Sequence, residues 1–165
     1  MGIVKREDKL MFISSEAGGA DQTYNRMKYF TDLSTSKNPV EYSRRYVDEA
    51  TERTDVTGYA TSIAYAFDQY TDDAAQEKIV EITDNELTGE AAIVSILIVD
   101  LSGTESSGAY PARMRNFAVI PDSEGDSTDA YTYSGTLKAN GDSVIGTAAT
   151  TDEWLTCTFT EKEAE

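Results

Sequence analysis

The chain has 165 residues, with 30 acidic side chains, 14 basic side chains and no histidine, which gives a net charge of −16. This length fits one domain over residues 1–165, with residues 1–9 and 161–165 as flexible tails. Without histidine and with a single cysteine, Cys157, the chain lacks the residues for a Ser-His-Asp or Cys-His catalytic site, for most zinc and haem sites and for an internal disulfide.

The charge and hydropathy patterns exclude further classes. The acidic balance argues against nucleic-acid binding by charge attraction and against docking on anionic membranes. No apolar run approaches the roughly 18 residues that span a bilayer, and the N-terminus, MGIVKREDKL, has no apolar segment typical of a signal peptide. The first 50 residues hold eight acids and eight bases, so the whole surplus of acid lies in residues 51–165. This asymmetry fits either ordinary solubility or an acidic surface beside a balanced surface that binds other copies.

The first third of the chain predicts short strands separated by turns. Tyr42 and Tyr46 share one face of the segment 41–47, but neither face is apolar enough for a core, which predicts an exposed or interfacial strand. The polar segment 48–58 then forms the tip of a long hairpin. The other expected elements are a strand at 10–15, a loop at 17–22, a strand at 27–33 and a turn-rich break at 34–39.

The middle of the chain gives the clearest signals. Residues 59–67 alternate large and small side chains, which predicts a strand with another surface packed closely on its small-residue face. Residues 73–84 predict the one helix, capped by Asp72 or Asp73, with Gln76 at capping-box distance from Asp73. Its apolar stripe requires a sheet to pack against, because a helix of about three turns is unstable alone.

The last part of the chain predicts the remaining strands. Residues 91–99 are almost wholly apolar and predict a central strand buried on both faces. Asn140-Gly141 predicts a hairpin turn between strands at 130–139 and 143–147, because both residues tolerate positive φ. The other expected elements are a strand at 112–120, an acidic loop at 121–129, and a closing strand at 153–160 with Leu155, Cys157 and Phe159 inward.

Candidate chemistry is sparse. The loop 122–129 spaces its acids as a calcium loop does, but Ser127 and Tyr133 stand where that pattern needs Gly and Glu. Arg113 and Arg115 fit an ion pair with an acid better than a phosphate grip. Tyr131 and Tyr133 could stack on sugars, although cross-strand packing is the commoner use. We therefore expect no catalytic, metal or cofactor site, and no enzyme activity.

Six segments between Lys28 and Glu161 stand in a characteristic order: NPVEYSRRYVDEATERTDVTGYATSIAYAFDQY, DDAAQEKIVEI, AAIVSILIVDL, YPARMRNFAVIPDSEGD, AYTYSGTLKANGDSVIG and DEWLTCTFTE. In this order they resemble the major tail protein, or tail-tube protein, of long-tailed bacteriophages and prophages of low-GC Gram-positive bacteria. The resemblance implies a mainly β fold, a β-sandwich or half-barrel with one short flanking helix and a long hairpin arm.

The resemblance also implies a function without a cofactor. Copies of such proteins close into hexameric rings through edge strands, and the rings stack into a tube that delivers the genome to the host. The implied partners are the chain itself, the tape-measure, terminator and distal tail or baseplate proteins, and double-stranded DNA that passes without sequence-specific binding. The implied location is the virion tail, after synthesis in the bacterial cytoplasm. Contractile and non-contractile tails both fit.

Residues 41–58 are too polar for a core and long for a loop, which predicts an arm that reaches a neighbouring subunit. The expected interface residues are Tyr42, Arg44, Arg45, Tyr46 and Arg53, with the arginines meeting acids of the neighbour. The expected channel-lining residues are Tyr59, Thr61, Ser62 and Ala64. Two alternatives stay open: a carbohydrate- or receptor-binding β-sandwich with exposed tyrosines, and a metal-dependent enzyme using the loop 122–129.

Overall fold

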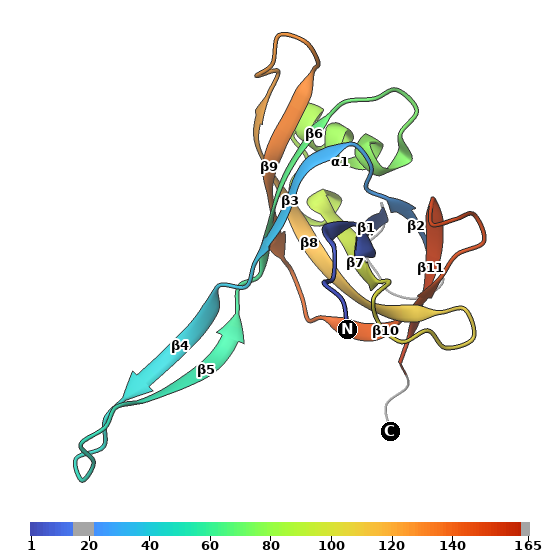
Figure 1. Ribbon diagram of the computed structural model, residues 1–165. Helices are drawn as coiled ribbons and strands as arrows, with labels where there is room; N and C mark the ends of the chain where they lie inside the picture. The colour runs from blue at the N-terminus through green and yellow to red at the C-terminus, as the bar shows by residue number, and fades with distance from the viewer. Residues whose placement is uncertain (15–21, 163–165) are drawn as a thin grey trace.

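A computed structural model describes residues 1–14 and 22–162, and consists of an antiparallel sheet of nine strands, a separate two-stranded sheet and one α-helix (Figure 1). The mainly β fold with one helix and a hairpin arm is confirmed. The loop expected at 17–22 lies outside the described residues, apart from Gln22. The elements are β1 (Lys9–Ser14), β2 (Thr23–Arg26), β3 (Phe30–Ser36), β4 (Pro39–Arg44), β5 (Arg53–Tyr59), β6 (Ser62–Asp68), α1 (Ala74–Asp84), β7 (Ile93–Asp100), β8 (Tyr110–Glu124), β9 (Thr132–Ala139), β10 (Val144–Ala149) and β11 (Thr156–Glu161), with short 3₁₀ turns at Arg6–Asp8 and Gly89–Ala92.

Part of the large sheet closes on itself. β10 pairs with both β11 and β8, so the strands β8, β7, β1, β2, β11 and β10 form a barrel without a free edge. Closure removes unpaired backbone groups that would otherwise template aggregation. The barrel interior is filled by one apolar cluster from all six strands: Leu10, Phe12, Tyr24, Leu97, Val99, Ala112, Met114, Ala148, Cys157 and Phe159.

The sheet continues beyond the barrel because β8 is 15 residues long. Its first half pairs with β10, and its second half pairs with β9, which pairs with β6, which pairs with β3. We call β3, β6, β9 and the second half of β8 the outer sheet. The sequence expected this strand to end at residue 120 and 121–129 to be a loop; instead the strand runs to Glu124.

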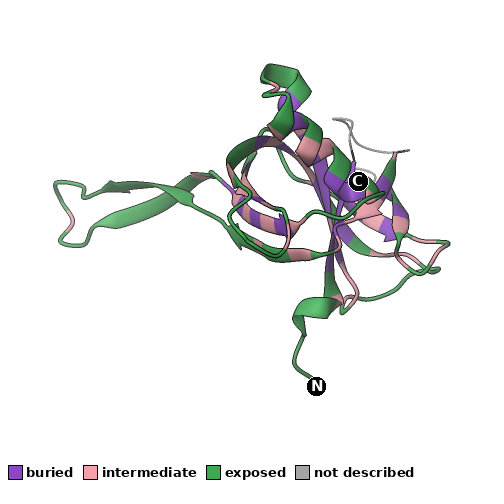
Figure 2. Ribbon diagram, turned by 90° about the horizontal axis from the view of Figure 1, so that it is seen from above, coloured by how far each residue is buried: buried purple, intermediate pink, exposed green. Residues whose placement is uncertain are grey.

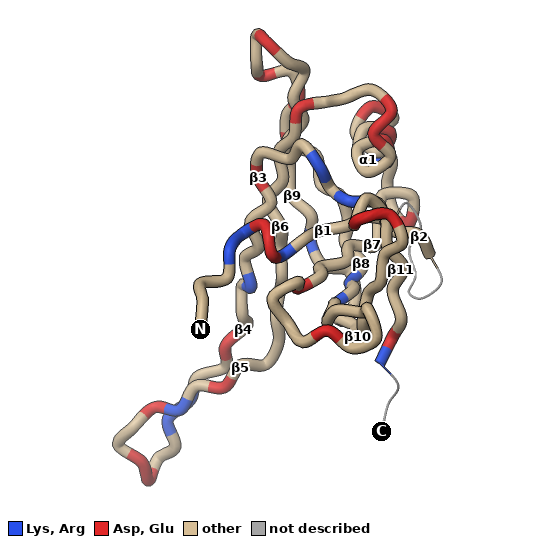
Figure 3. The backbone as a smooth tube through the Cα atoms, turned by 45° about the vertical axis from the view of Figure 1, so that its right-hand side comes forward, with Lys and Arg blue, Asp and Glu red and all other residues tan. Residues whose placement is uncertain are grey.

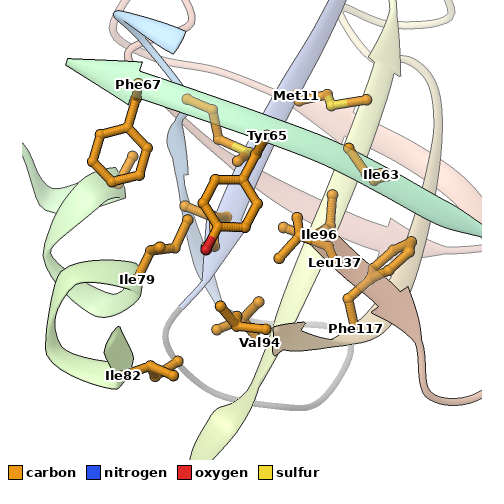
Figure 4. Close-up of a cluster of buried hydrophobic side chains, with 14 of the residues drawn as sticks. Met11, Ile63, Tyr65, Phe67, Ile79, Ile82, Val94, Ile96, Phe117 and Leu137 are labelled. Carbon is orange, nitrogen blue, oxygen red and sulfur yellow. The ribbon is translucent and has the colours of Figure 1, made fainter. Parts of the chain in front are cut away.

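A second apolar core lies between the barrel wall, the outer sheet and α1 (Figure 4). Successive residues of β7 alternate between the cores: Val94 and Ile96 belong to the second core, and Leu97 and Val99 belong to the barrel. This double burial explains why residues 91–99 are almost wholly apolar, as expected for a central strand. β6 contributes Ile63, Tyr65 and Phe67 to the second core and turns its small residues outward, which confirms the predicted alternation within 62–67. The close packing predicted for the small-residue face is wrong, because the second core packs against the large residues instead.

The helix lies close to its predicted span. The Asp73 carboxylate accepts a hydrogen bond from the backbone N–H of Ala75 (3.0 Å), and Ala75, Ile79 and Ile82 are buried against the sheet. The predicted role of Gln76 is wrong. Its side chain is buried and bridges backbone groups outside the helix, donating to the carbonyl of Asp68 and accepting from the N–H of Tyr70 (both 2.9 Å).

The hairpin predicted at Asn140-Gly141 is wrong. β9 and β10 do not pair with each other; both run antiparallel to β8, one after the other along the same edge. The residues between them form a kink, where Asn140 N–H donates to the Asn116 carbonyl (2.8 Å) and Arg115 donates to the Gly141 carbonyl (2.7 Å). Positive φ at Gly141 serves this kink, which carries the chain from the outer sheet into the barrel.

Other predicted boundaries shift for local reasons. The strand expected at 27–33 is interrupted, because Tyr29 has positive φ (62°) between β2 and β3. Leu155, expected inward, is 48% exposed and precedes β11. Lys9 and Glu161, assigned to terminal tails, lie in β1 and β11. Within the described residues, no helix is long and apolar enough to cross a membrane.

Candidate assembly surfaces

The β4–β5 arm projects away from both cores as a twisted two-stranded ribbon. All of β4 is exposed, as is nearly all of β5, whereas the sheet behind them alternates buried and half-buried residues (Figure 2). At the base of the arm, the Asn38 amide donates to the carbonyl of Ala60 (3.0 Å) and to the hydroxyl of Ser62 (3.1 Å). These bonds fix where the arm leaves the body. Because an isolated two-stranded hairpin is marginally stable in water, packing against a partner surface would stabilise the arm.

The predicted interface residues gather near the tip of this arm. The Arg44 guanidinium lies 4.6 Å from the centroid of the Tyr42 ring and 5.6 Å from that of the Tyr46 ring. The Arg53 guanidinium lies 5.9 Å from the centroid of the Tyr46 ring. Such cation–π contacts hold the side chains in place. Arg53 also makes two hydrogen bonds of 2.8 Å to Glu49 of the same arm. Its charge is therefore already paired, which the sequence did not anticipate.

Arg44 and Arg45 differ from Arg53 in having no acidic partner in the described part of the chain. Among the ion pairs formed by residues 1–14 and 22–162, neither takes part. Tyr42, Arg44, Arg45, Tyr46 and Arg53 are all exposed. An aromatic and cationic cluster on a projecting arm is the composition enriched at protein interfaces, where Tyr and Arg act as anchors.

The predicted channel residues do not share one surface, because one of them is buried. Tyr59 ends β5 and is 57% exposed, whereas Thr61 is 6% exposed and accepts a hydrogen bond from Arg115 (3.1 Å). Ser62 and Ala64 point to the outward face of β6, opposite the second core. The structure therefore brings Ser62 and Ala64 together on one surface and separates Thr61 from it. Arg115 binds the uncharged oxygens of Thr61 and Gly141, not the acid that the sequence favoured.

The outward face of the outer sheet is lined mainly by small and polar side chains, together with the exposed Ile120. The strand register places Ser34, Ala64, Thr136 and Ile120 in one row across β3, β6, β9 and β8. The neighbouring row contains Asp32, Ala66, Ser134 and Ser123, and the hydroxyls of Ser123 and Ser134 are 2.9 Å apart. We call this surface the open face. Sequence reasoning found only its β6 residues, because the pairing of β6 with β3 and β9 joins segments distant in the chain.

The outer sheet has two free edges. In the described part of the chain, β3 pairs only with β6, and β7 pairs with β8 only as far as Ala118. Residues 119–124 of β8 therefore have β9 on one side and no strand on the other. Free edges present unpaired N–H and C=O groups to another chain. A strand from another chain could therefore pair with the outer sheet at either edge.

The remaining candidates have structural roles. Tyr133 is buried and donates its hydroxyl to Asp84 (3.1 Å), and burial together with that carboxylate raises the pKa of Tyr133. Tyr131 is 51% exposed and donates to Glu124. Burial raises the pKa of the Cys157 thiol to about 12, which leaves it protonated and unreactive at neutral pH. Within residues 1–14 and 22–162, no group of three or more Cys, Asp or Glu side chains is placed to hold a metal ion.

Comparison with known proteins yields a likeness of fold to solved structures. No protein-family model and no curated protein matches the chain. Among solved structures, the chain is similar to a chain of the cryo-EM structure of the anti-feeding prophage (AFP) baseplate, with a TM-score of 0.47 and 9% sequence identity. The match covers 88% of this chain and 95% of that chain.

Proposed function

We propose that the chain is a structural subunit of a phage-type tail tube, which assembles with copies of itself into hexameric rings that stack into a conduit for DNA. The resemblance of residues 28–161 to tail-tube proteins motivates this proposal. The observation that carries it is the outer sheet, which has a free edge on each side and an open face of small polar residues between them.

Ring closure would join the two free edges. β3 of one copy would pair with residues 119–124 of β8 in the next, so that the outer sheets form a continuous wall. The Leu33 carbonyl accepts a hydrogen bond from Arg6, so it points to the free edge of β3, and the backbone groups of Thr35 point the same way. This edge therefore offers the backbone groups of Thr35 to an incoming strand, and the Leu33 carbonyl once Arg6 is displaced.

The open face would then line the channel. Because this face carries few cations, it would hold the phosphate backbone of DNA only weakly. A chain of net charge −16 would repel phosphates rather than hold them, so the genome could slide through. The arm would reach a neighbouring copy, with Arg44 and Arg45 meeting its acids.

The experiment is negative-stain electron microscopy of the concentrated protein at low and high salt. We expect hollow rings or tubes of uniform width in the wild type. Thr35→Pro removes one edge donor of β3 without removing a ladder bond to β6, so it should abolish rings while leaving a folded monomer. Thr35→Ala, which keeps the N–H, is the matched control and should still form rings. Rings of normal width from Thr35→Pro would contradict closure through β3.

A further inference from the structure

A basic groove lies at the end of the molecule from which the arm departs. It has a volume of about 820 Å³ and runs between the barrel wall, the N-terminal segment and the free edge of β3. Its floor follows a single row of paired residues across four barrel strands, apolar except for Arg113: Met11 of β1, Ile98 of β7, Arg113 of β8 and Ile145 of β10. Met11 is buried, but Ile145 is 57% exposed, so the β10 end of the floor is open to a partner.

Cations surround this floor. The groove is lined by one carboxylate, Asp100, and by the basic residues Lys5, Arg6, Lys9, Lys37 and Arg113. Lys9 lies 3.8 Å from Asp100, whereas Arg6 donates to the backbone carbonyls of Lys9 and Leu33, which do not neutralise its charge. The groove thus concentrates positive charge in a chain whose net charge is −16.

The opposite end of the molecule carries the complementary charge. The turn between β8 and β9 projects at the top of Figure 1, while the N-terminal segment and β10, which line the groove, lie at the bottom. Figure 3 shows acidic residues at this turn and around α1. The turn contains Asp126 and Asp129, directly after Asp122 and Glu124 of β8, and residues 121–131 contain no Lys or Arg.

We propose that the basic groove of one copy receives the acidic β8–β9 turn of a second copy stacked end to end on it. This inference rests on the proposed function and names the contact that would join one ring to the next. The turn supplies carboxylates for the cationic rim, and the exposed β10 end of the floor supplies apolar area that excludes water. Opposite charges across such a contact set its register and speed its formation.

The geometry is head to tail, because the groove and the turn lie at opposite ends of one chain. A contact of this kind leaves a free groove at one end and a free turn at the other, so it propagates into an open stack instead of closing a dimer. Exposed charges are screened at high ionic strength, so the contact weakens as salt rises.

Charge reversal tests the contact. Lys37→Glu/Arg113→Glu should reduce stacking to single rings in electron micrographs, and so should Asp126→Lys/Asp129→Lys. Lys28→Glu/Lys162→Glu changes the net charge by the same amount outside the groove and should stack as the wild type does. Combining the two groove reversals with the two turn reversals should restore tubes. Tubes of wild-type length from the groove variant, or a folded four-fold variant that stays as single rings, would overturn the proposal.

A crosslinking experiment separates this contact from ring formation. Full-length Arg113→Cys and Asp126→Cys proteins are mixed and treated with a short bis-maleimide; Cys157 is buried and does not compete. We expect a crosslinked pair containing one copy of each, at several times the yield of Arg113→Cys with Thr51→Cys in the arm tip. A preferred crosslink to Thr51→Cys would place the arm in the groove and overturn the proposal. Absence of rings in the wild type would count against the proposed function. The crosslink would still show whether the groove binds the β8–β9 turn of a second copy.

Discussion

The barrel and the arm differ in how their strand edges are paired and in how far their side chains are buried. The barrel pairs every one of its strands on both sides and fills its interior with large apolar side chains such as Phe12 and Phe159. The arm has two strands, no buried core and side chains exposed on both faces. The difference indicates that the barrel and its core sustain the monomer, whereas the arm contributes little to its stability.

The largest effect is expected in the barrel. Phe12 is fully buried and packs near Trp154, with ring centroids 6.1 Å apart. Phe12→Ala should lower the free energy of unfolding by roughly 3–5 kcal/mol, because it leaves a cavity among side chains that cannot collapse into it. Urea denaturation of the monomer measures the loss, with Tyr42→Ala in the arm as control. A comparable loss for both variants would erase the proposed division between barrel and arm.

A smaller loss is expected in the outer sheet. A methyl group at Gly135 would lie 2.6 Å from the carbonyl oxygen of Ile120 and 2.7 Å from the hydroxyl of Tyr65. The Tyr65 ring lies across the sheet from Gly135, in register, and occupies the space that a side chain would need. Gly135→Ala should therefore destabilise the protein by about 1–3 kcal/mol, measured by thermal unfolding. Gly58→Ala in the arm, where nothing lies within 4 Å, should be close to neutral.

High pH should loosen both cores. Burial raises the pKa of Cys157 in the barrel to about 12 from 9.0, and that of Tyr65 in the second core to about 12 from 10.0. Since the unfolded chain loses these protons first, stability is expected to fall between pH 9 and 12, by at most about 1.4 kcal/mol per pH unit for each group. Urea denaturation at pH 7, 9 and 10.5 should show this decline. Cys157→Ala should show a shallower one; an equal slope would mean that Cys157 does not contribute.

The smallest effect on the monomer is expected in the arm. Arg44→Glu/Arg45→Glu should change the free energy of unfolding by less than about 0.5 kcal/mol, because both residues are exposed. The same variant should abolish ring or tube assembly, seen by electron microscopy. Arg44→Lys/Arg45→Lys keeps the charge and is the control. Normal tubes from the charge-reversed protein would remove the arm from the assembly mechanism.

Local sequence patterns predicted those elements that can be recognised without knowing which strands or helices they pack against. The alternation in residues 59–67 predicted that β6 has two distinct faces, although not which of them is buried, and Asp73 marked the start of α1. The polarity of 41–58 predicted an exposed arm. In each case the signal is the periodicity or the chemistry of adjacent residues, which does not depend on distant parts of the chain.

The failures come from contacts that the local sequence pattern does not show. Asn140-Gly141 has the composition of a hairpin turn, yet β8 offers a longer edge along which β9 and β10 both pair. Gln76 has capping-box spacing, but its side-chain amide forms hydrogen bonds with the backbone groups of Asp68 and Tyr70 instead. Thr61 alternates onto the buried side, whereas Ser62 and Ala64, predicted to line the channel with it, lie on the opposite face.

The sequence by itself determined the β-rich class, the position of the helix, the exposed arm and the absence of histidine-based chemistry. Only the tertiary structure decided that the sheet closes into a barrel, that β1 and β7 serve two cores, and that basic residues from β1, β8, the N-terminal segment and the β3–β4 connection meet in one groove. The physical reason is that side-chain period fixes which face of a strand is buried, whereas the choice of neighbouring strand depends on backbone hydrogen bonds between residues far apart in the chain.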